Sequence, residues 1–394
     1  MEQEPLLIGI DGGATKVSAW EIVYDQHLST FSLGALNSTK SYREIEGFIP
    51  DFKPVDLTIQ LGERDAKIKT TAEEKQQAEV YVEACAQAIS ELVDKKDKRN
   101  VLIGIGMPGL KTADKRGIAV VANGPRMIEY SSKLEAKLKA RNISLNSPVD
   151  HLGSDADYCG IGENYSDSGT FRSHTNAYYL GGGTGVADAL KLDGKLVTFD
   201  NARDWMAKTW EMKSEEGLSL ERVTSVSGIQ KTYADFSNQT VEALNVKQIY
   251  PLQIAELAKG GDEAALKTFD VVNRNLARLL YERIVTLNRG WNNLFDFVNP
   301  NRAALNPVHN FTGKVFDVLV IGQRLGDLFE DENGKEVVKK LVIEQLNNLI
   351  QNSEFLPENV KIHYKNPDEI ICISKLREAP ALGAGVDAFI TQNN

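Results

Sequence analysis

The chain has 394 residues, of which 42% are hydrophobic and 25% charged, so it should form two or three ordinary globular domains. Its net charge of -10 argues against non-specific nucleic-acid binding, which needs clustered lysine and arginine. The sequence has neither a signal segment nor an apolar run of membrane-spanning length. We therefore expect a cytoplasmic protein with no membrane or nucleic-acid partner.

The cysteines are sparse and odd in number: Cys85, Cys159 and Cys372, with no Cys-x-x-Cys pair among them. Such a set builds neither a disulfide framework nor a four-thiolate metal site. The five histidines also lack metal-binding spacing. We therefore expect no zinc.

The first predicted strand, over residues 6–11, is short and apolar and runs into a glycine turn. Residues 17–23 can return as the second strand of a hairpin. The elements predicted next are a helix over 72–93, a strand over 101–106, a helix over 132–141, a strand over 149–152 and a helix over 156–164.

The same pattern then returns about half a chain later. A strand over residues 176–180 runs into the glycine-rich residues 181–185, and residues 186–192 form the return strand. This recurrence predicts two similar lobes, each with one glycine hairpin. The remaining predictions are helices over 252–258, 263–287, 336–350 and 378–391, strands over 316–321, 360–364 and 369–373, and a loop over 289–313.

The first glycine turn has the composition of a phosphate-binding loop. Gly12 and Gly13 leave room for backbone N–H groups to approach phosphate oxygens, and Thr15 adds a hydroxyl donor. Asp11, at the strand end, suits a hydrated Mg2+, which takes one or two carboxylates and keeps several waters. The alternative interpretation is a plain turn beside a charged residue.

The second glycine turn contains Gly182, Gly183, Thr184 and Gly185. Alone it could be a β-bulge or a tight hairpin. Two such turns in matching contexts favour a nucleotide clamp.

Two further positions have a chemical and a structural interpretation. Asp155, after a strand and at a helix start, could accept the proton of a hydroxyl that attacks a γ-phosphoryl group, or could simply cap the helix. Gly322, before Gln323, could lie against a purine or ribose, or could be a routine strand-to-helix turn.

In this order the motifs resemble those of the superfamily of sugar kinases, actin and heat-shock chaperones, and within it most closely the ROK sugar kinases. Residues 8–16 (IGIDGGATK) resemble the family's first phosphate loop, and their residue sequence is closer to that of the loop in N-acetylglucosamine kinases. Residues 154–157 (SDAD), followed by Gly162-Glu163, resemble the block whose aspartate is the catalytic base.

The resemblance implies an α/β fold of two actin-like, ribonuclease H-like lobes with a nucleotide cleft between them. The N-terminal lobe would comprise residues 1–150 and the closing helix at 378–394, and the C-terminal lobe residues 151–377. It also implies ATP and Mg2+ as cofactors, a small sugar-like substrate and a homodimer.

The site residues that follow from the resemblance fall into three groups. Asp155 would be the catalytic base, and Asp11 would hold Mg2+ through water. The ATP-binding residues would be Gly12, Gly13, Thr15, Lys16, Gly182, Gly183, Thr184, Gly185, Gly322 and Gln323. The substrate-binding residues would be Gly109, Asn123, Asp155, Glu211 and Glu221.

The sequence departs from the ROK pattern in its sugar-binding part. The zinc site of one His and three Cys is missing, and Glu211 is not followed by the Gly-His of the family's Glu-x-Gly-His motif. Ser154 replaces the asparagine before the base. An altered hexose, an amino sugar or another polyol therefore fits as well as glucose.

Three other functions use the same fold. A sugar-sensing repressor would need a DNA-binding module ahead of the first loop, where only ten residues precede Asp11. A metal-free ATPase switch would turn over ATP without an acceptor. A degenerate kinase would bind its ligand without turnover, although it would have no need for Asp11, Asp155 and both glycine loops.

Overall fold

The computed structural model describes residues 4–64 and 67–393, which form two compact units. The first unit comprises Met1–Gly169 with Glu378–Asn394, and the second Thr170–Arg377. The division lies after Gly169 rather than after residue 150, because helix α4 (Asp155–Tyr165) packs against the closing helix α16 (Ala379–Asn393) of the first unit. Asn394, included in the expected closing helix, lies outside the described residues.

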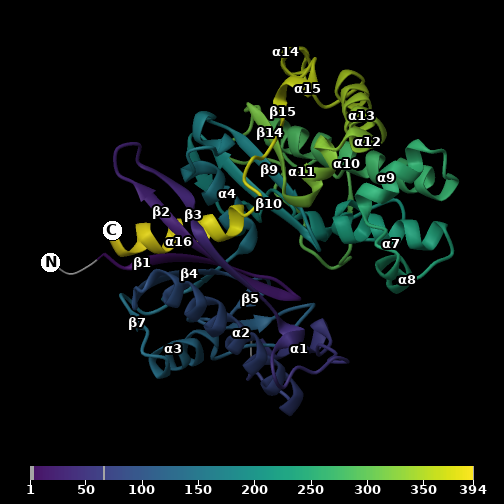
Figure 1. Cartoon of the computed structure of the whole chain (residues 1–394). Helices are drawn as coiled ribbons and strands as arrows, with labels where there is room; N and C mark the ends of the chain where they lie inside the picture. The colour runs from purple at the N-terminus through teal and green to yellow at the C-terminus, as the bar shows by residue number, and fades with distance from the viewer. Residues whose placement is uncertain (1–3, 65–66, 394) are drawn as a thin grey trace. The chain divides into compact units, whose positions relative to one another are not determined.

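The first unit is built on a mixed sheet with the strand order β3-β2-β1-β4-β7, and β8 also pairs with β4 (Figure 1). β1 runs antiparallel to β2 and parallel to β4. The strands are β1 (Leu6–Gly12), β2 (Lys16–Asp25), β3 (Thr30–Ser41), β4 (Asn100–Gly106), β5 (Leu110–Lys111), β6 (Ile118–Val120), β7 (Ser144–Leu145) and β8 (Leu152–Gly153). The other helices are η1 (Tyr42–Glu44), α1 (Leu57–Arg64), α2 (Ala72–Lys96) and α3 (Tyr130–Ala140).

Helix α16 lies directly on β1 and β4 because small residues meet on both sides of the contact. A Cβ at Gly9 would lie 1.8 Å from the Ala381 carbonyl oxygen, and one at Gly104 would lie 1.8 Å from the Ala384 carbonyl oxygen. Only glycine tolerates so close a backbone approach. The chain's last helix is thereby fixed against the central strands of the first sheet, as its small-residue face predicts.

The second unit repeats the strand path of the first, with the order β11-β10-β9-β14-β15. β9 again forms an antiparallel hairpin with the next strand and a parallel pair with the fourth. Its strands are β9 (Ala177–Gly182), β10 (Val186–Leu192), β11 (Lys195–Val197), β12 (Met212–Lys213), β13 (Asp296–Phe297), β14 (Val318–Gly322) and β15 (Ile371–Ile373). The repeated topology confirms the α/β class and the internal repeat.

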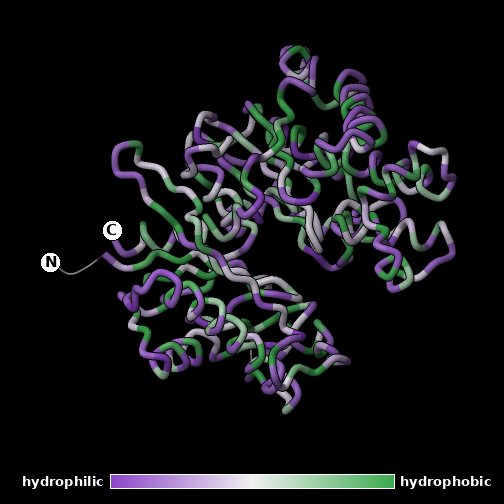
Figure 2. Tube along the Cα trace, in the orientation of Figure 1, coloured by the Kyte–Doolittle hydropathy of each residue, from purple (hydrophilic) through white to green (hydrophobic). Residues whose placement is uncertain are grey.

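Helices make up most of the remaining second unit. They are η2 (Thr170–Ser173), α5 (Phe199–Ala202), η3 (Thr209–Glu211), α6 (Leu220–Thr224), α7 (Val226–Phe236), α8 (Val241–Val246), α9 (Pro251–Lys259), α10 (Glu263–Arg289), α11 (Gln323–Glu330), α12 (Glu332–Gly334), η4 (Lys335–Lys339), α13 (Lys340–Gln351), α14 (Glu358–His363) and α15 (Pro367–Ile370). Asp262 caps α10 by accepting the Ala265 N–H at 2.8 Å. Figure 2 shows hydrophilic and hydrophobic residues alternating along these helices, as expected for elements with one buried face.

Two strand predictions near the C-terminus need correction. Residues 360–363 lie in helix α14 (Glu358–His363) and Tyr364 is its C-cap, because Val360 and Tyr364 are buried one helical turn apart while Ile362, between them, is 63% exposed. Of residues 369–373, only Ile371–Ile373 form a strand, since Pro367 starts the short helix α15. The predicted loop over 289–313 is irregular apart from Arg289, which ends α10, and β13.

The sequence also missed β3, whose residues TFSLGALNSTKS are rich in Ser, Thr and Asn. Pairing with β2 along most of its length holds this polar segment extended. Within the described ranges, every helix is too short or too polar to span a bilayer.

Candidate active site

The first glycine loop is a tight hairpin between β1 and β2. The Gly13 N–H donates to the Lys16 carbonyl at 2.9 Å and closes the turn. Thr15 and Lys16 are exposed at or beside its tip. The predicted phosphate-binding residues of the first unit therefore lie together on one short turn.

Two tyrosine side chains form hydrogen bonds with the backbone carbonyls of this loop. The Tyr42 hydroxyl donates to the Gly13 carbonyl at 3.1 Å, and the Tyr81 hydroxyl donates to the Ala14 carbonyl at 2.8 Å. Their rings stack with centroids 3.6 Å apart. Because the carbonyls are held by buried side chains, the loop backbone is kept in one conformation. Sequence reasoning missed both tyrosines, which are far apart in the chain and carry no local motif.

Asp11 lies at the carboxyl end of β1, opposite Gly106 of β4. Burial raises the pKa of Asp11 to about 7, and the negative charges of Asp155 and Glu378 add to the rise, whereas Lys16 opposes it. The structure thus brings the two predicted aspartates close enough for their charges to interact. It adds Glu378, which the sequence analysis did not assign to the site.

Asp155 is the first residue of α4, and it does not serve as the helix cap. Ser154 is the N-cap, and its hydroxyl accepts the Asp157 N–H at 3.4 Å. Ser154, and not Asp155, therefore caps the helix. Asp155 thus lies at the N-terminus of α4 with its carboxylate not used for capping.

Asn123 is exposed on the segment that links β6 to α3. Buried hydrogen bonds fix the chain on both sides of Asn123. Gln60 exchanges two hydrogen bonds with the backbone of Val121, and the guanidinium of Arg126 forms a two-pronged pair with Glu74 at 2.7 and 2.8 Å. An exposed amide on a rigid backbone is suited to hydrogen-bonding a substrate hydroxyl.

Gly109 follows β4 with a φ of 95°, in the left-handed region that favours glycine. It is exposed, and its carbonyl accepts from Lys111 Nζ at 3.0 Å. Gly109, on the segment that follows β4, and Asn123, on the segment that follows β6, are therefore both exposed.

The second glycine loop joins β9 to β10 in the second unit. The Gly183 N–H donates to the Gly185 carbonyl at 2.9 Å, which closes a turn one residue shorter than the first. The Val186 N–H donates to Glu221 Oε1 at 3.1 Å. The structure therefore places Glu221, an expected substrate-binding residue, against the second glycine loop.

Gln323 opens helix α11 beside the same loop. It forms a parallel bridge with Gly182 and has a φ of 56°. This left-handed conformation costs a non-glycine residue about 1–3 kcal/mol and is held by the surrounding structure. Gly322 and Gln323 thus lie next to the second glycine loop. The strained conformation of Gln323 indicates that the surrounding structure fixes its backbone.

Glu211 is engaged in a different way. Its carboxylate pairs with Arg302, whose Nε lies 2.8 Å from Oε1, and it accepts the Lys208 N–H at 2.9 Å. Its side chain is only 6% exposed. Both oxygens are occupied by the protein itself, so a sugar-binding role would require this pair to open.

No group of three or more His, Cys, Asp or Glu side chains in residues 4–64 and 67–393 is arranged to hold a metal ion. The fit of Mg2+ therefore depends on Asp11. A buried carboxylate whose ionised form is disfavoured by Asp155 and Glu378 is stabilised by a nearby cation, and Mg2+ needs few protein ligands. The residues of the first unit fit a hydrated Mg2+, whereas the expected absence of zinc stays a prediction.

Comparison with known proteins gives a fold and no close relative. No protein-family profile matches the sequence, and no curated protein is detectably similar. A ROK family glucokinase from Streptomyces griseus, solved with glucose and AMPPNP, has a TM-score of 0.58 at 17% identity over 98% of this chain and 99% of that chain. The ROK hexokinase from Thermus thermophilus gives 0.57 at 16% identity over 98% and 99%.

A ROK family transcriptional regulator, a homologue of the E. coli MLC protein, has the same fold. Its TM-score is 0.54 at 12% identity, over 98% of this chain and 78% of that chain. The chain therefore has the fold of the ROK sugar kinases, as its motifs predict.

Proposed function

We propose that this chain, which has the fold of the ROK sugar kinases, transfers the γ-phosphoryl group of ATP to a hydroxyl of a sugar or sugar-like metabolite. The observation that carries the proposal is that Asp155 lies close enough to Asp11 for their charges to interact. Asp11 stands at the strand end that opens the first glycine hairpin. A base and a metal-binding carboxylate beside a phosphate loop are what phosphoryl transfer to an alcohol needs.

In the proposed reaction Asp155 aligns the acceptor hydroxyl and takes its proton. The hydroxyl oxygen bonds to the γ-phosphorus as the bond between that phosphorus and the bridging oxygen breaks, and ADP leaves with the electron pair. The transition state is loose, so proton transfer is late and the base acts mainly by orienting the oxygen. Most of the acceleration comes from positioning and charge neutralisation.

The glycine turns supply the phosphate contacts. Gly12, Gly13 and Thr15 of the first loop, and residues 182–185 of the second, lie against the phosphates. Gly322 and Gln323 face the adenosine. Asp11 would hold Mg2+ through water, and a bound Mg2+ would supply positive charge that offsets the charge of the phosphates.

Gly109 and Asn123 are proposed to bind the acceptor together with Asp155. The Glu211–Arg302 pair separates this chain from the usual sugar-binding pattern, because Arg302 occupies the carboxylate. This supports an acceptor other than unmodified glucose, such as an altered hexose, an amino sugar or another polyol.

The proposal is tested by following ADP release from MgATP against a panel of hexoses, amino sugars, N-acetylated sugars and polyols. A strong dependence on one acceptor supports the kinase and identifies its substrate. Turnover that ignores every acceptor contradicts it and favours an ATPase switch. Absence of turnover, with ATP still raising the melting temperature, favours a binder such as the sugar-sensing regulators.

The Glu221 contact leads to a prediction about the nucleotide. Glu221→Gln weakens the carboxylate bond to the Val186 N–H that holds the end of the second loop. We expect the KM for MgATP to rise about 3- to 10-fold, because a neutral acceptor replaces a charged one in this hydrogen bond, with the acceptor KM unchanged. Steady-state kinetics with each substrate varied in turn measures this.

The matched control is Glu216→Gln. Glu216 also accepts hydrogen bonds in the second unit, from Arg274 at 2.8 Å and Asn275 at 3.0 Å, but it is not placed at the glycine loop. We expect both KM values to stay unchanged in this control. If Glu221→Gln instead raises the KM for the acceptor and leaves the KM for MgATP unchanged, this prediction is wrong and Glu221 binds the acceptor.

A further inference from the structure

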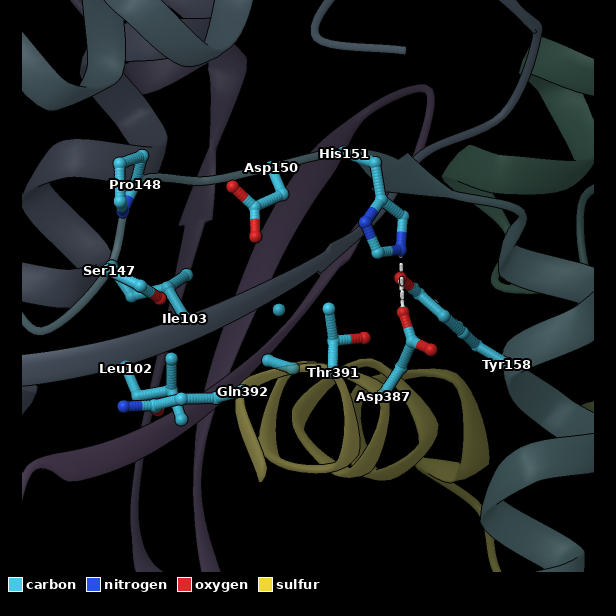
Figure 3. Close-up of a pocket in the computed structure, with 12 residues that line it drawn as sticks. Leu102, Ile103, Ser147, Pro148, Asp150, His151, Tyr158, Asp387, Thr391 and Gln392 are labelled. Carbon is cyan, nitrogen blue, oxygen red and sulfur yellow. Dashed lines mark hydrogen bonds and ion pairs between the residues drawn. The ribbon is translucent and has the colours of Figure 1, made fainter. Parts of the chain in front are cut away.

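Three side chains from three separate segments form a hydrogen-bonded chain within the first unit (Figure 3). Asp387 of α16 accepts from the Tyr158 hydroxyl of α4 at 2.9 Å. His151, just before β8, places Nε2 2.7 Å from the same carboxylate oxygen. One oxygen of Asp387 thus ties α4 and the start of β8 to the closing helix.

The ring of Tyr158 fills the space beneath two strand ends. A Cβ at Gly106 would lie 2.9 Å from Tyr158 Cδ2, and one at Gly153 would lie 2.0 Å from Tyr158 Cζ. Both positions must be glycine for the ring to lie there. Tyr158 is only 3% exposed, so its place is fixed by packing as well as by its hydroxyl.

These strand ends are the ones from which both candidate carboxylates emerge. Gly106 pairs with Asp11 on one side and with Gly153 on the other. Asp155 follows Gly153 by two residues and begins the helix that carries Tyr158. The position of the Tyr158 ring therefore sets where α4, and with it Asp155, meets the strand of Asp11.

The cavity beside the three side chains is too small for a metabolite. Its volume is about 20 Å3, which is room for one water molecule. Its lining includes Asp150 and Thr391, which Figure 3 places beside His151 and Asp387. The cluster is therefore better explained by the helices and the strand that its side chains join.

We propose that Tyr158, Asp387 and His151 are positioning residues that hold α4 on the strand ends and so keep Asp155 aligned for catalysis. The proposal rests on the proposed kinase function, because it gives Asp155 its role. It assigns the closing helix a part in the active site without any contact to the substrate.

The charges around His151 strengthen this anchor. Its hydrogen bond to Asp387 raises the pKa of His151, and Asp150 adds to the rise, while burial and Lys115 oppose it. The imidazolium form, which pairs with the Asp387 carboxylate, is therefore favoured more than it is in a free histidine. Replacing Asp387 by asparagine removes this ion pair and leaves the side-chain size almost unchanged.

The kinetic test compares Tyr158→Phe and Asp387→Asn with the wild type, using the acceptor found in the panel. Phenylalanine keeps the ring between the glycines and removes only the hydroxyl. We expect kcat to fall about tenfold in each variant, since a small displacement of a catalytic group is costly, with both KM values within about twofold of wild type. His151→Gln, which retains a donor, should lose less than His151→Ala.

The matched control is Tyr281→Phe, which removes a buried hydroxyl that donates to Ser353 at 2.6 Å in the second unit. It should lower the melting temperature comparably and leave kcat unchanged. An equal kcat in Tyr158→Phe and the control, or an unchanged kcat in Asp387→Asn, would overturn the proposal.

Hydrogen–deuterium exchange of Asp155–Tyr165 decides the same question without any acceptor. We expect the amides of this helix to exchange about tenfold faster in Asp387→Asn than in the wild type, and at the wild-type rate in Tyr281→Phe. Unchanged exchange in Asp387→Asn would contradict the anchoring. If the wild type shows no acceptor-dependent turnover, the kinase function fails, and the exchange rates still decide whether these residues hold α4.

Discussion

Replacement of Asp155 by alanine is expected to lower kcat roughly 100-fold or more, with little change in the affinity for MgATP. In the proposed reaction the carboxylate aligns and deprotonates the acceptor hydroxyl, and the phosphate contacts come from other residues. Ser154 takes the helix-capping role, so the loss should not be a consequence of unfolding α4. Initial-rate kinetics and calorimetric titration with a non-hydrolysable ATP analogue measure the two quantities separately.

Asp157→Asn is the matched control for Asp155. Asp157 lies in the same first turn of α4 and carries the same charge toward the helix dipole. We expect its kcat to remain near wild type. If Asp155→Ala turns over at the wild-type rate, the assignment of Asp155 as the base is wrong, whichever acceptor is used.

Replacement of Asp11 by asparagine is expected to stabilise the ligand-free protein at alkaline pH while removing most of its activity. The pKa of Asp11 is raised to about 7 in the folded state by burial and by the neighbouring Asp155 and Glu378. An unfolded aspartate titrates near ~3.9. Between these two values the folded state holds more protons, so stability falls as pH rises and the full penalty is present above about pH 7.

The size of this penalty follows from the shift. At ~1.4 kcal/mol per pKa unit, ionised Asp11 costs about 2–4 kcal/mol above pH 7, and asparagine avoids that cost. We therefore expect the gain in unfolding free energy from Asp11→Asn to be about 2 kcal/mol larger at about pH 8 than at about pH 5. Urea unfolding of both proteins without Mg2+ or nucleotide measures it.

The control for this experiment is Asp262→Asn, at the N-cap of α10. Asparagine caps a helix about as well as aspartate, so this change should be nearly neutral at both pH values. A gain from Asp11→Asn that is the same at both pH values would show that Asp11 is not held in a raised-pKa environment.

Much of the fold follows from local sequence signals. Apolar runs ending in glycine turns identified both hairpins, β1–β2 and β9–β10, because a buried strand and its turn are encoded by adjacent residues. The recurrence of this pattern predicted the two units. Segments such as α14 were misassigned because a short apolar run does not distinguish a strand from a helix until the buried face is known.

Site residues could be predicted where a single segment of the chain contains the motif, but not where segments distant in sequence meet in the fold. Asp11 and Asp155 follow from motifs, but Glu378 approaches them only through the folding of α16 onto the sheet. The stacked Tyr42 and Tyr81 are another such case. Contacts of this kind depend on register and packing, which one sequence does not encode locally.

The central claim is tested most directly by following the γ-phosphoryl group itself. Wild type and Asp155→Asn are incubated with γ-32P-labelled ATP, Mg2+ and each acceptor, and the products are separated. We predict label on the hydroxyl of one sugar-like acceptor, lost in the variant. Label that appears only as inorganic phosphate, at a rate independent of every acceptor, would contradict the kinase and leave an ATPase on the same fold.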